Sequence, residues 1–306
     1  MRNSKVASLA EAIDTFVGDD AVVALEGFTH LIPFAAGHEL IRQEKKGLTL
    51  CRLTPDIVAD QLAAAGVISK LVFSWMGNPG VGSLHAIRRR IEGSDSRHLA
   101  IEEYSHFGMV ARYVAGAGNL PFYPLRSYSG SDLPSVNPSI REVRSPFDGE
   151  MIHVVPPLNP DVTIVHVQRA SAFGDGQIWG IPGCQKEAAF AADSVILTCE
   201  EIVSEELIRA DANRTMIPGE IVDAVVEVAG GCHPSYAQGY YDRDNEFYLE
   251  WDVISRDPRA IEDWLADRVI GTRDHRGYLD KLGAERWGRL AAGSRVSPGV
   301  DYGSYR

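Results

Sequence analysis

The sequence of 306 residues contains little cysteine, and its four cysteines follow no metal-binding or redox spacing. No pair is spaced as CxxC, and no cysteine and histidine cluster has the spacing of a zinc site. We therefore expect no metal site, and free thiols in a reducing cytoplasm. These thiols are Cys51, Cys184, Cys199 and Cys232.

Long apolar runs and an excess of positive charge are also absent. No run approaches the ~20 apolar residues that span a bilayer. The segment 1–20 has acidic residues and an amphipathic helical pattern, which a signal peptide lacks. The net charge of −12 repels nucleic acid and anionic membranes. We therefore predict a cytoplasmic protein that binds neither nucleic acid nor a membrane.

The sequence does contain a regular alternation of apolar strands and amphipathic helices. The expected strands cover 21–25, 47–53, 69–75, 99–105, 161–168, 194–202 and 223–231. The expected helices cover 9–17, 35–43, 56–66, 85–93 and 259–290. This βαβ rhythm predicts an α/β fold, with an open, mostly parallel sheet and helices on both faces.

One segment, 126–160, interrupts the alternation. It is rich in proline, serine and glycine, and we interpret it as a long surface excursion rather than a linker between domains. We therefore expect a single domain over residues 1–290, followed by a loose C-terminal tail over residues 291–306.

Three polar loops follow expected strands. Ligands of parallel α/β sheets bind at the carboxyl ends of the strands, so these loops are the first places to look for a site. They read "EGFTH" (26–30), "GNPGVGS" (77–83) and "EEYSH" (102–106).

The glycine-rich loop at 77–83 has the wrong spacing for a nucleotide loop. A Walker A motif needs a lysine and a serine or threonine after its last glycine, whereas Gly82 is followed by serine and leucine. Gly77, Gly80 and Gly82 do not fit GxGxxG either. Two interpretations remain. Ser83 caps the next helix, whose start attracts an anion such as a carboxylate, or the loop is a plain turn.

Acidic and histidine side chains are further candidates. Glu102 and Glu103 are neighbours on an expected strand, so they point to opposite faces. One of them could face a cleft as acid, base or nucleophile, and the alternative is a solvated strand end. The acidic side chains within 199–211 have helical spacing and predict an exposed helix face. His166 is expected to be a satisfied core histidine, and His233 a structural residue in a turn.

Six blocks of the sequence resemble the A (alpha) chain of the family I CoA-transferases, and together they cover the chain from about residue 9 to residue 290. They are "GDDAVVALEGFTHLIPFAAGHELIRQ", "KLVFSWMGNPGVGSLH", "IEEYSH", "NLPFYPLRSYSGSDLP", "TCEEIVSEELIR" and "GGCHPSYAQGYYDRDNEFY". The second half resembles the alpha subunit of glutaconate CoA-transferase. The similarity to the alpha subunit of 3-oxoadipate CoA-transferase is stronger at "LEGFTHLIP" and "FSWMGNPGVGSLH". Glutaconate-type chains carry two glycines where this chain has Glu26 and Gly27, which favours the 3-oxoadipate-like branch.

The resemblance implies the family I CoA-transferase fold and an obligate B subunit, in a complex expected to be α2β2. It also implies a ping-pong transfer of CoA from succinyl-CoA, or another acyl-CoA, to a dicarboxylic oxo acid such as 3-oxoadipate. CoA enters as a thioester substrate, and no permanently bound cofactor is implied. In this family the nucleophilic glutamate lies in the B subunit, often in a Ser-Glu-Asn-Gly motif, which this sequence lacks. We therefore expect the chain to be inactive alone and to form a wall of the acyl pocket.

The first two loops are expected to bind the acyl group. A dicarboxylate needs its far carboxylate held, and backbone N–H groups and short polar side chains in these loops can do so. The expected substrate-binding residues are Phe28, Thr29, Asn78, Gly80 and Ser83. This assignment follows from their loop positions and not from the family.

Other functions stay open. A glutaconate-type CoA-transferase is the alternative within the same reaction class. Some relatives are CoA-dependent hydrolases that open steroid-derived rings with a glutamate of the alpha subunit, in a segment that resembles "IEEYSH". Glu103 aligns best with that glutamate and is the candidate catalytic residue on this chain. A non-catalytic protein of the same fold, binding an acyl-CoA or a sugar phosphate, is the third alternative.

Overall fold

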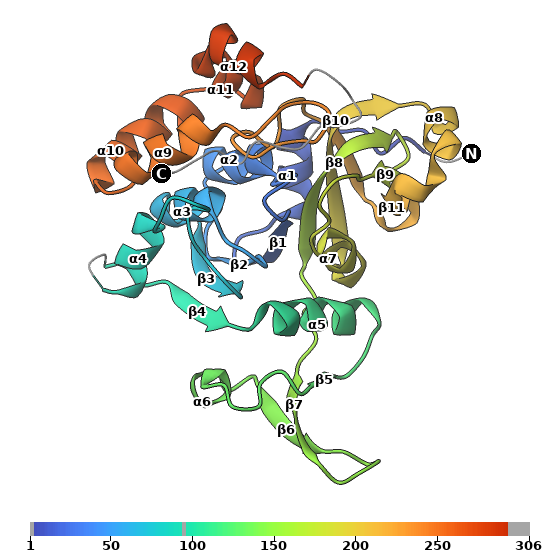
Figure 1. Ribbon diagram of the computed structural model, residues 1–306. Helices are drawn as coiled ribbons and strands as arrows, with labels where there is room; N and C mark the ends of the chain where they lie inside the picture. The colour runs from blue at the N-terminus through green and yellow to red at the C-terminus, as the bar shows by residue number, and fades with distance from the viewer. Residues whose placement is uncertain (1–2, 94–95, 293–306) are drawn as a thin grey trace.

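The main sheet has helices on both faces, in a computed structural model that describes residues 3–93 and 96–292 (Figure 1). Nine strands within this part of the chain form the sheet. They are β1 (Val22–Glu26), β2 (Leu48–Cys51), β3 (Ile68–Phe73), β4 (Ala100–Glu103), β8 (Val162–Ser171), β9 (Gly176–Gln177), β10 (Ser194–Val203), β11 (Thr215–Ile217) and β12 (Ala224–Glu227). The predicted α/β fold is confirmed.

The strand order is β11-β9-β8-β1-β2-β3-β4, and β10 pairs with both β8 and β12. The long strand β8 pairs along its first half with β1 and along its whole length with β10. The pairs among β1, β2, β3, β4, β8, β10 and β12 are parallel, whereas β9 is antiparallel to β8 and β11. The carboxyl ends of β1 to β4 consequently lie at one edge of the sheet.

Alternate side chains of each strand pack against helices on opposite faces. On β1, Val23 and Leu25 pack into one cluster, whereas Ala24 packs into another. The first face is covered by α1 (Leu9–Phe16), α2 (Phe34–Arg42), α3 (Ile57–Ala64) and α4 (His85–Ile91). The second face is covered by α5 (His106–Ala117) and α7 (Gln185–Ala191). Helices on both faces are therefore confirmed.

Side-chain caps fix where several helices begin. Ser8 and Glu11 form a capping box at the start of α1. Asp56 accepts a hydrogen bond from the N–H of Val58 at the start of α3, and Ser105 caps α5 in the same way. Because the caps of α3 and α5 lie close behind strand ends, they also set the geometry of the loops at the sheet edge.

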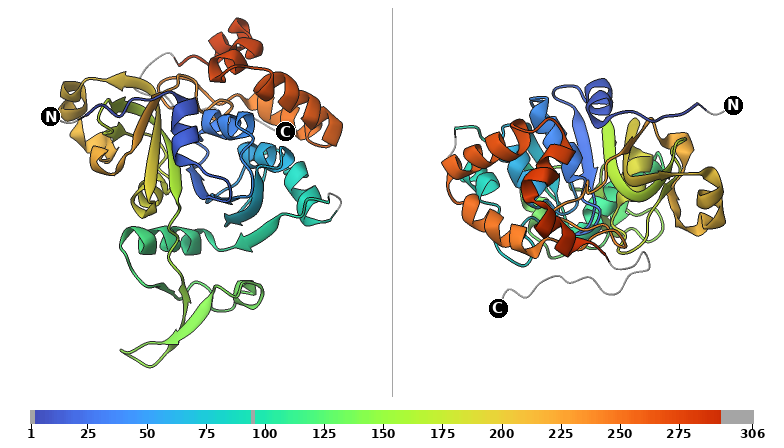
Figure 2. Two further views of the ribbon diagram at one scale, coloured as in Figure 1. Left: turned by 180° about the vertical axis from the view of Figure 1, so that it is seen from behind. Right: turned by 90° about the horizontal axis from the view of Figure 1, so that it is seen from above.

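An antiparallel arm projects from the body between α5 and β8 (Figures 1 and 2). It consists of β5 (Tyr123–Leu125), β6 (Arg141–Arg144) and β7 (Met151–Val155), in the order β5-β7-β6, with the short helix α6 (Leu133–Val136). The segment predicted as a surface excursion is therefore an excursion with its own small sheet.

Helical elements near the C-terminus follow, and residues of the first three pack into the cluster of the first helical layer. They are α9 (Asn245–Ile254), α10 (Pro258–Leu265), the π-helical turn η3 (Ala266–Ile270), α11 (His275–Leu282) and α12 (Ala284–Leu290). The remaining short elements are α8 (Glu205–Ala210), η1 (Ala212–Arg214) and η2 (Gly219–Ile221). None of the helices in the described residues combines the length and the apolar character that a bilayer crossing requires. Beyond Ala292 the predicted tail lies outside the described residues, and the division at residue 290 stays a prediction.

Candidate functional site

Three loops follow β1, β3 and β4, and the parallel order places them at the same edge of the sheet. Phe28 in the loop after β1 meets His106, the first residue of α5, directly behind the loop after β4, with ring centroids 6.5 Å apart in an edge-to-face contact. The structure therefore brings the first and third loops together, although β2 and β3 separate their strands in the sheet.

The loop after β1 has a strained backbone. Thr29 and Leu31 adopt left-handed conformations, with φ of 56° and 53°, which a β-branched or bulky residue rarely adopts. Gly27 allows a close approach, because a Cβ there would lie 2.5 Å from the main-chain oxygen of Leu31. The Oγ1 atom of Thr29 is buried and has no hydrogen-bond partner among the described residues. Backbone strain together with an unpaired hydroxyl is typical of a ligand-binding loop.

The glycine-rich loop is a closed turn with a fixed base. The main-chain N–H of Asn78 donates to the oxygen of Gly82 at 2.8 Å, and the N–H of Gly82 donates back at 3.0 Å. The Nδ2 atom of buried Asn78 donates to the main-chain oxygen of Tyr248 on α9 at 2.8 Å. The Oδ1 atom of Asn78 has no partner within the described chain. Gly80, near the tip, is exposed and left-handed, with φ of 79°.

Ser83 does not cap the helix after this loop, so that prediction is wrong. Helix α4 begins at His85 with Leu84 at the N-cap position, and no described side chain caps it. The Oγ atom of Ser83 instead accepts a hydrogen bond from Arg88 at 3.3 Å. Because one further residue separates the serine from the helix start, its hydroxyl does not reach the free N–H groups there.

Glu102 and Glu103 have different surroundings, as expected for neighbours on a strand. Glu102 is partly buried and accepts three hydrogen bonds, from Lys70, Tyr104 and Arg112. Partial burial raises the pKa of Glu102, but these three partners outweigh it, so the pKa lies below its ordinary value. Glu103 is exposed. Of the two carboxylates, Glu103 is the accessible one.

Glu26, the last residue of β1, lies directly behind the first loop, and the sequence did not mark it as a site residue. Its Oε1 atom accepts hydrogen bonds from the N–H of Leu53 and from the hydroxyl of Tyr113, both at 2.9 Å. Burial is the largest effect and raises the pKa of Glu26, whereas the charge of Arg52 lowers it. Glu26 therefore ties the end of β1 to the end of β2 and to α5.

The acidic segment 199–211 is not one exposed helix, so that prediction is wrong. Residues up to Val203 belong to β10, and α8 begins only at Glu205. The two-residue period of the strand buries Glu200 and leaves Glu201 partly exposed. The periodicity was ambiguous because a strand and a helix meet within this short segment.

Buried Glu200 forms a compact group with His166 and Cys232, whose donor atoms all lie within 4.8 Å of one another. The residue types would suit a metal ion, but their atoms are already engaged. Glu200 Oε1 lies 2.9 Å from His166 Nε2 and accepts from Tyr241, and its Oε2 accepts from the N–H of Gly230. Burial raises the pKa of the Cys232 thiol well above its ordinary value. The group is therefore a hydrogen-bonded support, and His166 is confirmed as a satisfied core histidine.

His233 fixes the turn after β12. Its Nε2 lies 2.8 Å from Oδ2 of Asp244, and its Nδ1 lies 2.7 Å from the hydroxyl of Tyr278. Burial raises the pKa of Asp244, but His233 and Arg286 outweigh burial and bring it to about 2. The interpretation of His233 as a structural residue is confirmed.

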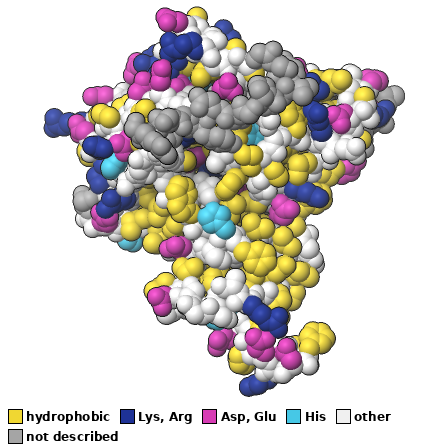
Figure 3. Space-filling model, in the orientation of Figure 1, with side chains coloured by type: hydrophobic (Ala, Val, Ile, Leu, Met, Phe, Trp, Pro, Cys, Tyr) yellow, Lys and Arg dark blue, Asp and Glu magenta, His cyan; other side chains and the backbone are white. Residues whose placement is uncertain are grey.

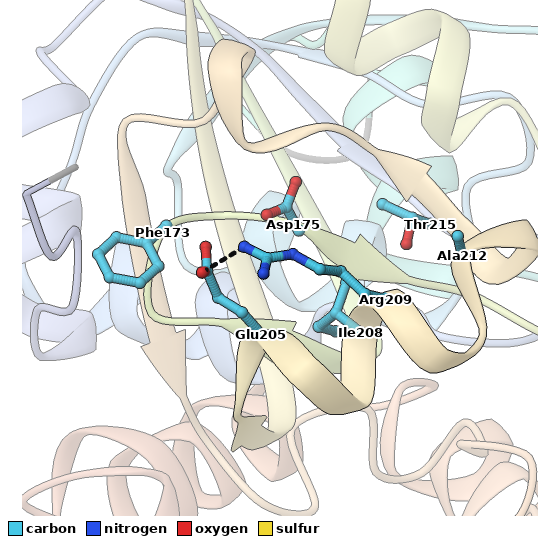
Figure 4. Close-up of a pocket in the computed structure, with 7 residues that line it drawn as sticks. All are labelled: Phe173, Asp175, Glu205, Ile208, Arg209, Ala212 and Thr215. Carbon is cyan, nitrogen blue, oxygen red and sulfur yellow. Dashed lines mark hydrogen bonds and ion pairs between the residues drawn. The ribbon is translucent and has the colours of Figure 1, made fainter. Parts of the chain in front are cut away.

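A cavity of about 770 Å³ lies beyond the carboxyl end of β10, apart from the three loops (Figure 4). Its lining residues are Phe173, Asp175, Glu205, Ile208, Arg209, Ala212 and Thr215. Arg209 and Glu205 form an ion pair of 2.6 Å across its wall, and Asp175 accepts from the N–H of Gly219. None of the predicted site residues lines this cavity, and its charged groups are paired with the wall.

Comparison with known sequences identifies the family of this chain. The family model for coenzyme A transferase matches residues 6–228. The alpha (A) chain of 3-oxoadipate CoA-transferase from Pseudomonas knackmussii is 50% identical over 91% of this chain and 98% of its own length. The alpha (A) chain of glutaconate CoA-transferase from Acidaminococcus fermentans is 34% identical over 98% of this chain and 97% of its own length. The IpdA subunit of a cholesterol ring-cleaving hydrolase from Rhodococcus jostii is 26% identical over 79% of this chain and 84% of its own length.

Structural comparison agrees. The crystal structure of glutaconate CoA-transferase from Acidaminococcus fermentans superposes with a TM-score of 0.90, covering 97% of each chain. The resemblance seen in the sequence blocks is thus found in sequence identity, in the family model and in the fold. The chain therefore belongs to the coenzyme A transferase family, as a subunit of the alpha type.

Proposed function

We propose that the chain is the alpha subunit of a heteromeric CoA-transferase that moves CoA from succinyl-CoA, or another acyl-CoA, to a dicarboxylic oxo acid such as 3-oxoadipate. The observation that carries the proposal is the 50% identity to the alpha subunit of 3-oxoadipate CoA-transferase over 98% of that relative. The lower identity of 34% to the glutaconate enzyme makes a glutaconate-type reaction the alternative within the family.

The nucleophile comes from the B subunit in this proposal, because the sequence has no Ser-Glu-Asn-Gly motif. The partner's glutamate carboxylate attacks the thioester carbonyl, forms an acyl anhydride and releases the CoA thiolate. The thiolate then attacks the glutamyl carbonyl, which gives a glutamyl-CoA thioester and frees the first acid. The acceptor acid reverses both steps, so CoA leaves on the new acyl group and the glutamate is regenerated.

This chain binds and orients the acyl group in the proposal. The hydroxyl of Thr29 can donate to a carboxylate, and its burial without a described partner supports that role. The exposed, left-handed Gly80 lets the backbone of the glycine loop approach the ligand. Phe28, in edge-to-face contact with His106, supplies an apolar wall of the site. The acyl group would lie between these loops and the partner's glutamate.

The surface supports an obligate partner. Large hydrophobic side chains are exposed on β4, on α5 and its following turn, and on the arm. They are Ile101, Phe107, Leu120, Phe122, Val136, Phe147 and Met151, and Phe147 is 96% exposed. Figure 3 shows a broad hydrophobic area around α5 and the strand ends above it. Such an area on a soluble chain marks a protein interface, and we assign it to the B subunit of a cytoplasmic α2β2 complex.

Reconstitution tests the proposed function. The chain, co-purified with its B subunit, should convert succinyl-CoA and 3-oxoadipate into 3-oxoadipyl-CoA, and neither of the two chains should be active by itself. A panel of acceptor acids in the same assay distinguishes 3-oxoadipate from glutaconate. A correctly assembled complex that transfers CoA to none of these acids would refute the proposal.

A ring-opening hydrolase is the second candidate, because Glu103 is exposed at the end of β4 and the ring-cleaving relative matches 79% of this chain. A Glu103→Ala variant separates the two functions. Hydrolysis by Glu103 predicts loss of all activity, whereas transfer by a partner glutamate predicts a reduction of about tenfold or less in kcat/KM. The identity of 26% to this relative, against 50% to the transferase, makes the hydrolase the weaker candidate.

A further inference from the structure

A buried arginine holds the backbone at the start of the first loop. Arg52 follows β2 directly, and its side chain has no exposed surface. Its Nη1 atom donates to the main-chain oxygen of Leu25 at 2.5 Å, and its Nη2 atom donates to that of Gly27 at 3.0 Å. The planar fork of a guanidinium can reach two such acceptors at once, whereas an ammonium presents a single point charge. Arg52 therefore sets where the first loop leaves β1.

A second buried arginine holds the glycine-rich loop. Arg243 is 5% exposed, and its Nη2 atom donates to the main-chain oxygen of Pro79 at 2.9 Å. Its guanidinium lies over the ring of Tyr248, 3.7 Å from the ring centroid. The main-chain oxygen of the same Tyr248 accepts from Asn78. Two successive residues of the glycine loop are thus attached to α9 and to the segment just before it.

Asp56 pairs with the first of these arginines. Its Oδ2 atom lies 3.2 Å from Nη2 of Arg52, and its Oδ1 atom accepts from the N–H of Val58, which caps α3. Asp56 is 2% exposed. Burial raises the pKa of Asp56, and the charges of both Arg52 and Arg243 act against burial. The buried carboxylate is therefore paired with Arg52 and fixes the start of α3.

The main chain beside Asp56 also touches the glycine loop. The oxygen of Leu53 accepts from the N–H and the hydroxyl of Ser74, and the oxygen of Pro55 accepts from the N–H of Gly77 at 3.2 Å. Residues 52–56 consequently contact the first loop through a side chain, the glycine loop through one carbonyl, and the residue after β3 through another. Their place after β2, between β1 and β3, makes both contacts possible.

We propose that Asp56 is a positioning residue that couples the first loop, which Arg52 holds, to the second loop, which the neighbouring Pro55 and the buried Arg243 hold, and so fixes the gap between them. This inference rests on the proposed function, in which the acyl group lies in that gap. The three residues need not touch the substrate. They act on the backbone of Gly27 and Pro79, from which Phe28, Thr29 and Gly80 project.

Amide hydrogen exchange tests the coupling without any substrate. Asp56→Asn keeps the size and the cap acceptor but removes the charge, and it should speed exchange about tenfold in both 27–31 and 77–83. Arg52→Lys should affect chiefly the first loop, and Arg243→Lys chiefly the second. If Asp56→Asn changes exchange in neither loop, or in just one of them, the coupling is refuted.

Arg90 provides a matched control. It is 4% exposed and donates to the main-chain oxygens of Ala63 and Ile68, at the opposite end of β3. Arg90→Lys should therefore lower stability without changing exchange in either loop. If it accelerates both loops as Asp56→Asn does, the effect is general loosening and the proposal fails.

Kinetics of the assembled complex complete the test. Arg52→Lys and Arg243→Lys should each lower kcat/KM by about 10- to 100-fold, because misplaced loops misplace the acyl group, whereas Arg90→Lys should not. The double variant should lose less than the product of the two single losses, since both loops position the same acyl group. Strictly multiplicative losses would refute the coupling. If the wild-type complex transfers CoA to no acid, the proposed function fails, and the exchange experiment still decides the positioning role.

Discussion

Two buried glutamates on the carboxyl side of the sheet are held in different ways. Glu200 on β10 has both carboxylate oxygens in hydrogen bonds with protein partners, which are His166, Tyr241 and the N–H of Gly230. Glu26 on β1 accepts from Leu53 and Tyr113 through Oε1. In the loops after β1 and β3, Thr29 Oγ1 and Asn78 Oδ1 are buried and have no partner among the described residues. Glu200 thus belongs to a closed network, and the loops after β1 and β3 keep free hydrogen-bonding capacity.

The difference separates structural burial from functional burial. A buried polar group without a partner destabilises the fold, so it persists where a ligand can supply the missing bond. A fully satisfied network rigidifies the fold around it. The acidic residue type is the same in both regions. The candidate site differs from the Glu200 network in the unpaired polar atoms of its loops.

The largest expected effect comes from opening the closed network. Glu200→Ala leaves His166, Tyr241 and the Gly230 amide without their common partner, so we expect it to lower the free energy of unfolding by about 3–5 kcal/mol. Urea unfolding followed by circular dichroism measures the change. Glu201→Ala, on the same strand but partly exposed and paired with Arg169, is the control, expected to cost about 1 kcal/mol or less. Equal losses in the two variants would contradict the comparison.

Acidification is expected to act on histidines in both regions. Burial lowers the pKa of His30, at the first loop, to about 4, and that of His275, which contacts the Gly230 oxygen, to about 3. The unfolded chain binds these protons near pH 6.5, so each histidine removes stability as the pH falls from about 6.5 towards its folded pKa. Above pH 6.5 neither contributes. At pH 4.5 the loss is about 2–3 kcal/mol for each histidine.

Variants isolate these contributions from those of other groups. Burial raises the pKa of Asp60 to about 6, which has the opposite sign, so total stability against pH is not a clean readout. Between pH 7.5 and 4.5, the free energy of unfolding of His30→Gln and of His275→Gln should each fall by about 2–3 kcal/mol less than that of the wild type. The measurement is urea unfolding at both pH values. Identical pH dependence in wild type and variants would show that the histidines are not buried in the neutral form.

Hydrogen bonds to two glutamates of the candidate site, buried Glu26 and partly buried Glu102, test the effect of burial on a smaller scale. Tyr113→Phe removes one of the two hydrogen bonds that Glu26 Oε1 accepts, and should cost about 1–2 kcal/mol of unfolding free energy. Tyr104→Phe removes the equivalent bond to Glu102, which keeps Lys70 and Arg112 as partners. The second variant should cost less, about 0.5–1 kcal/mol. A larger cost for Tyr104→Phe, measured by urea unfolding, would mean that Glu26 is better solvated than its burial indicates.

The strands, the helical layers and the edge of the sheet that carries the site could be predicted from the sequence, because apolar periodicity reports them directly. The arginines at 52 and 243 could not, because their roles depend on contacts between segments far apart in the chain. Arg52 did carry a signal, since an arginine within the apolar run "LTLCRL" needs a buried partner. The position of Glu200 was missed because strand and helix periodicities overlap in one short segment.

The smallest expected difference concerns two serines that precede helices at the candidate site. Ser105 caps α5, and its Oγ accepts from the N–H of Gly108 at 3.0 Å, so Ser105→Ala should cost about 1 kcal/mol. Ser83 stands one residue too early to cap α4 and accepts from exposed Arg88 instead, so Ser83→Ala should cost less than about 0.5 kcal/mol. Urea unfolding of both variants measures the difference. A cost of about 1 kcal/mol for Ser83→Ala would restore the serine as a cap, and with it the anion site at the start of α4. A small stability cost combined with a raised KM for the acceptor acid would instead place the Ser83 hydroxyl against the substrate, where the loop position predicts it.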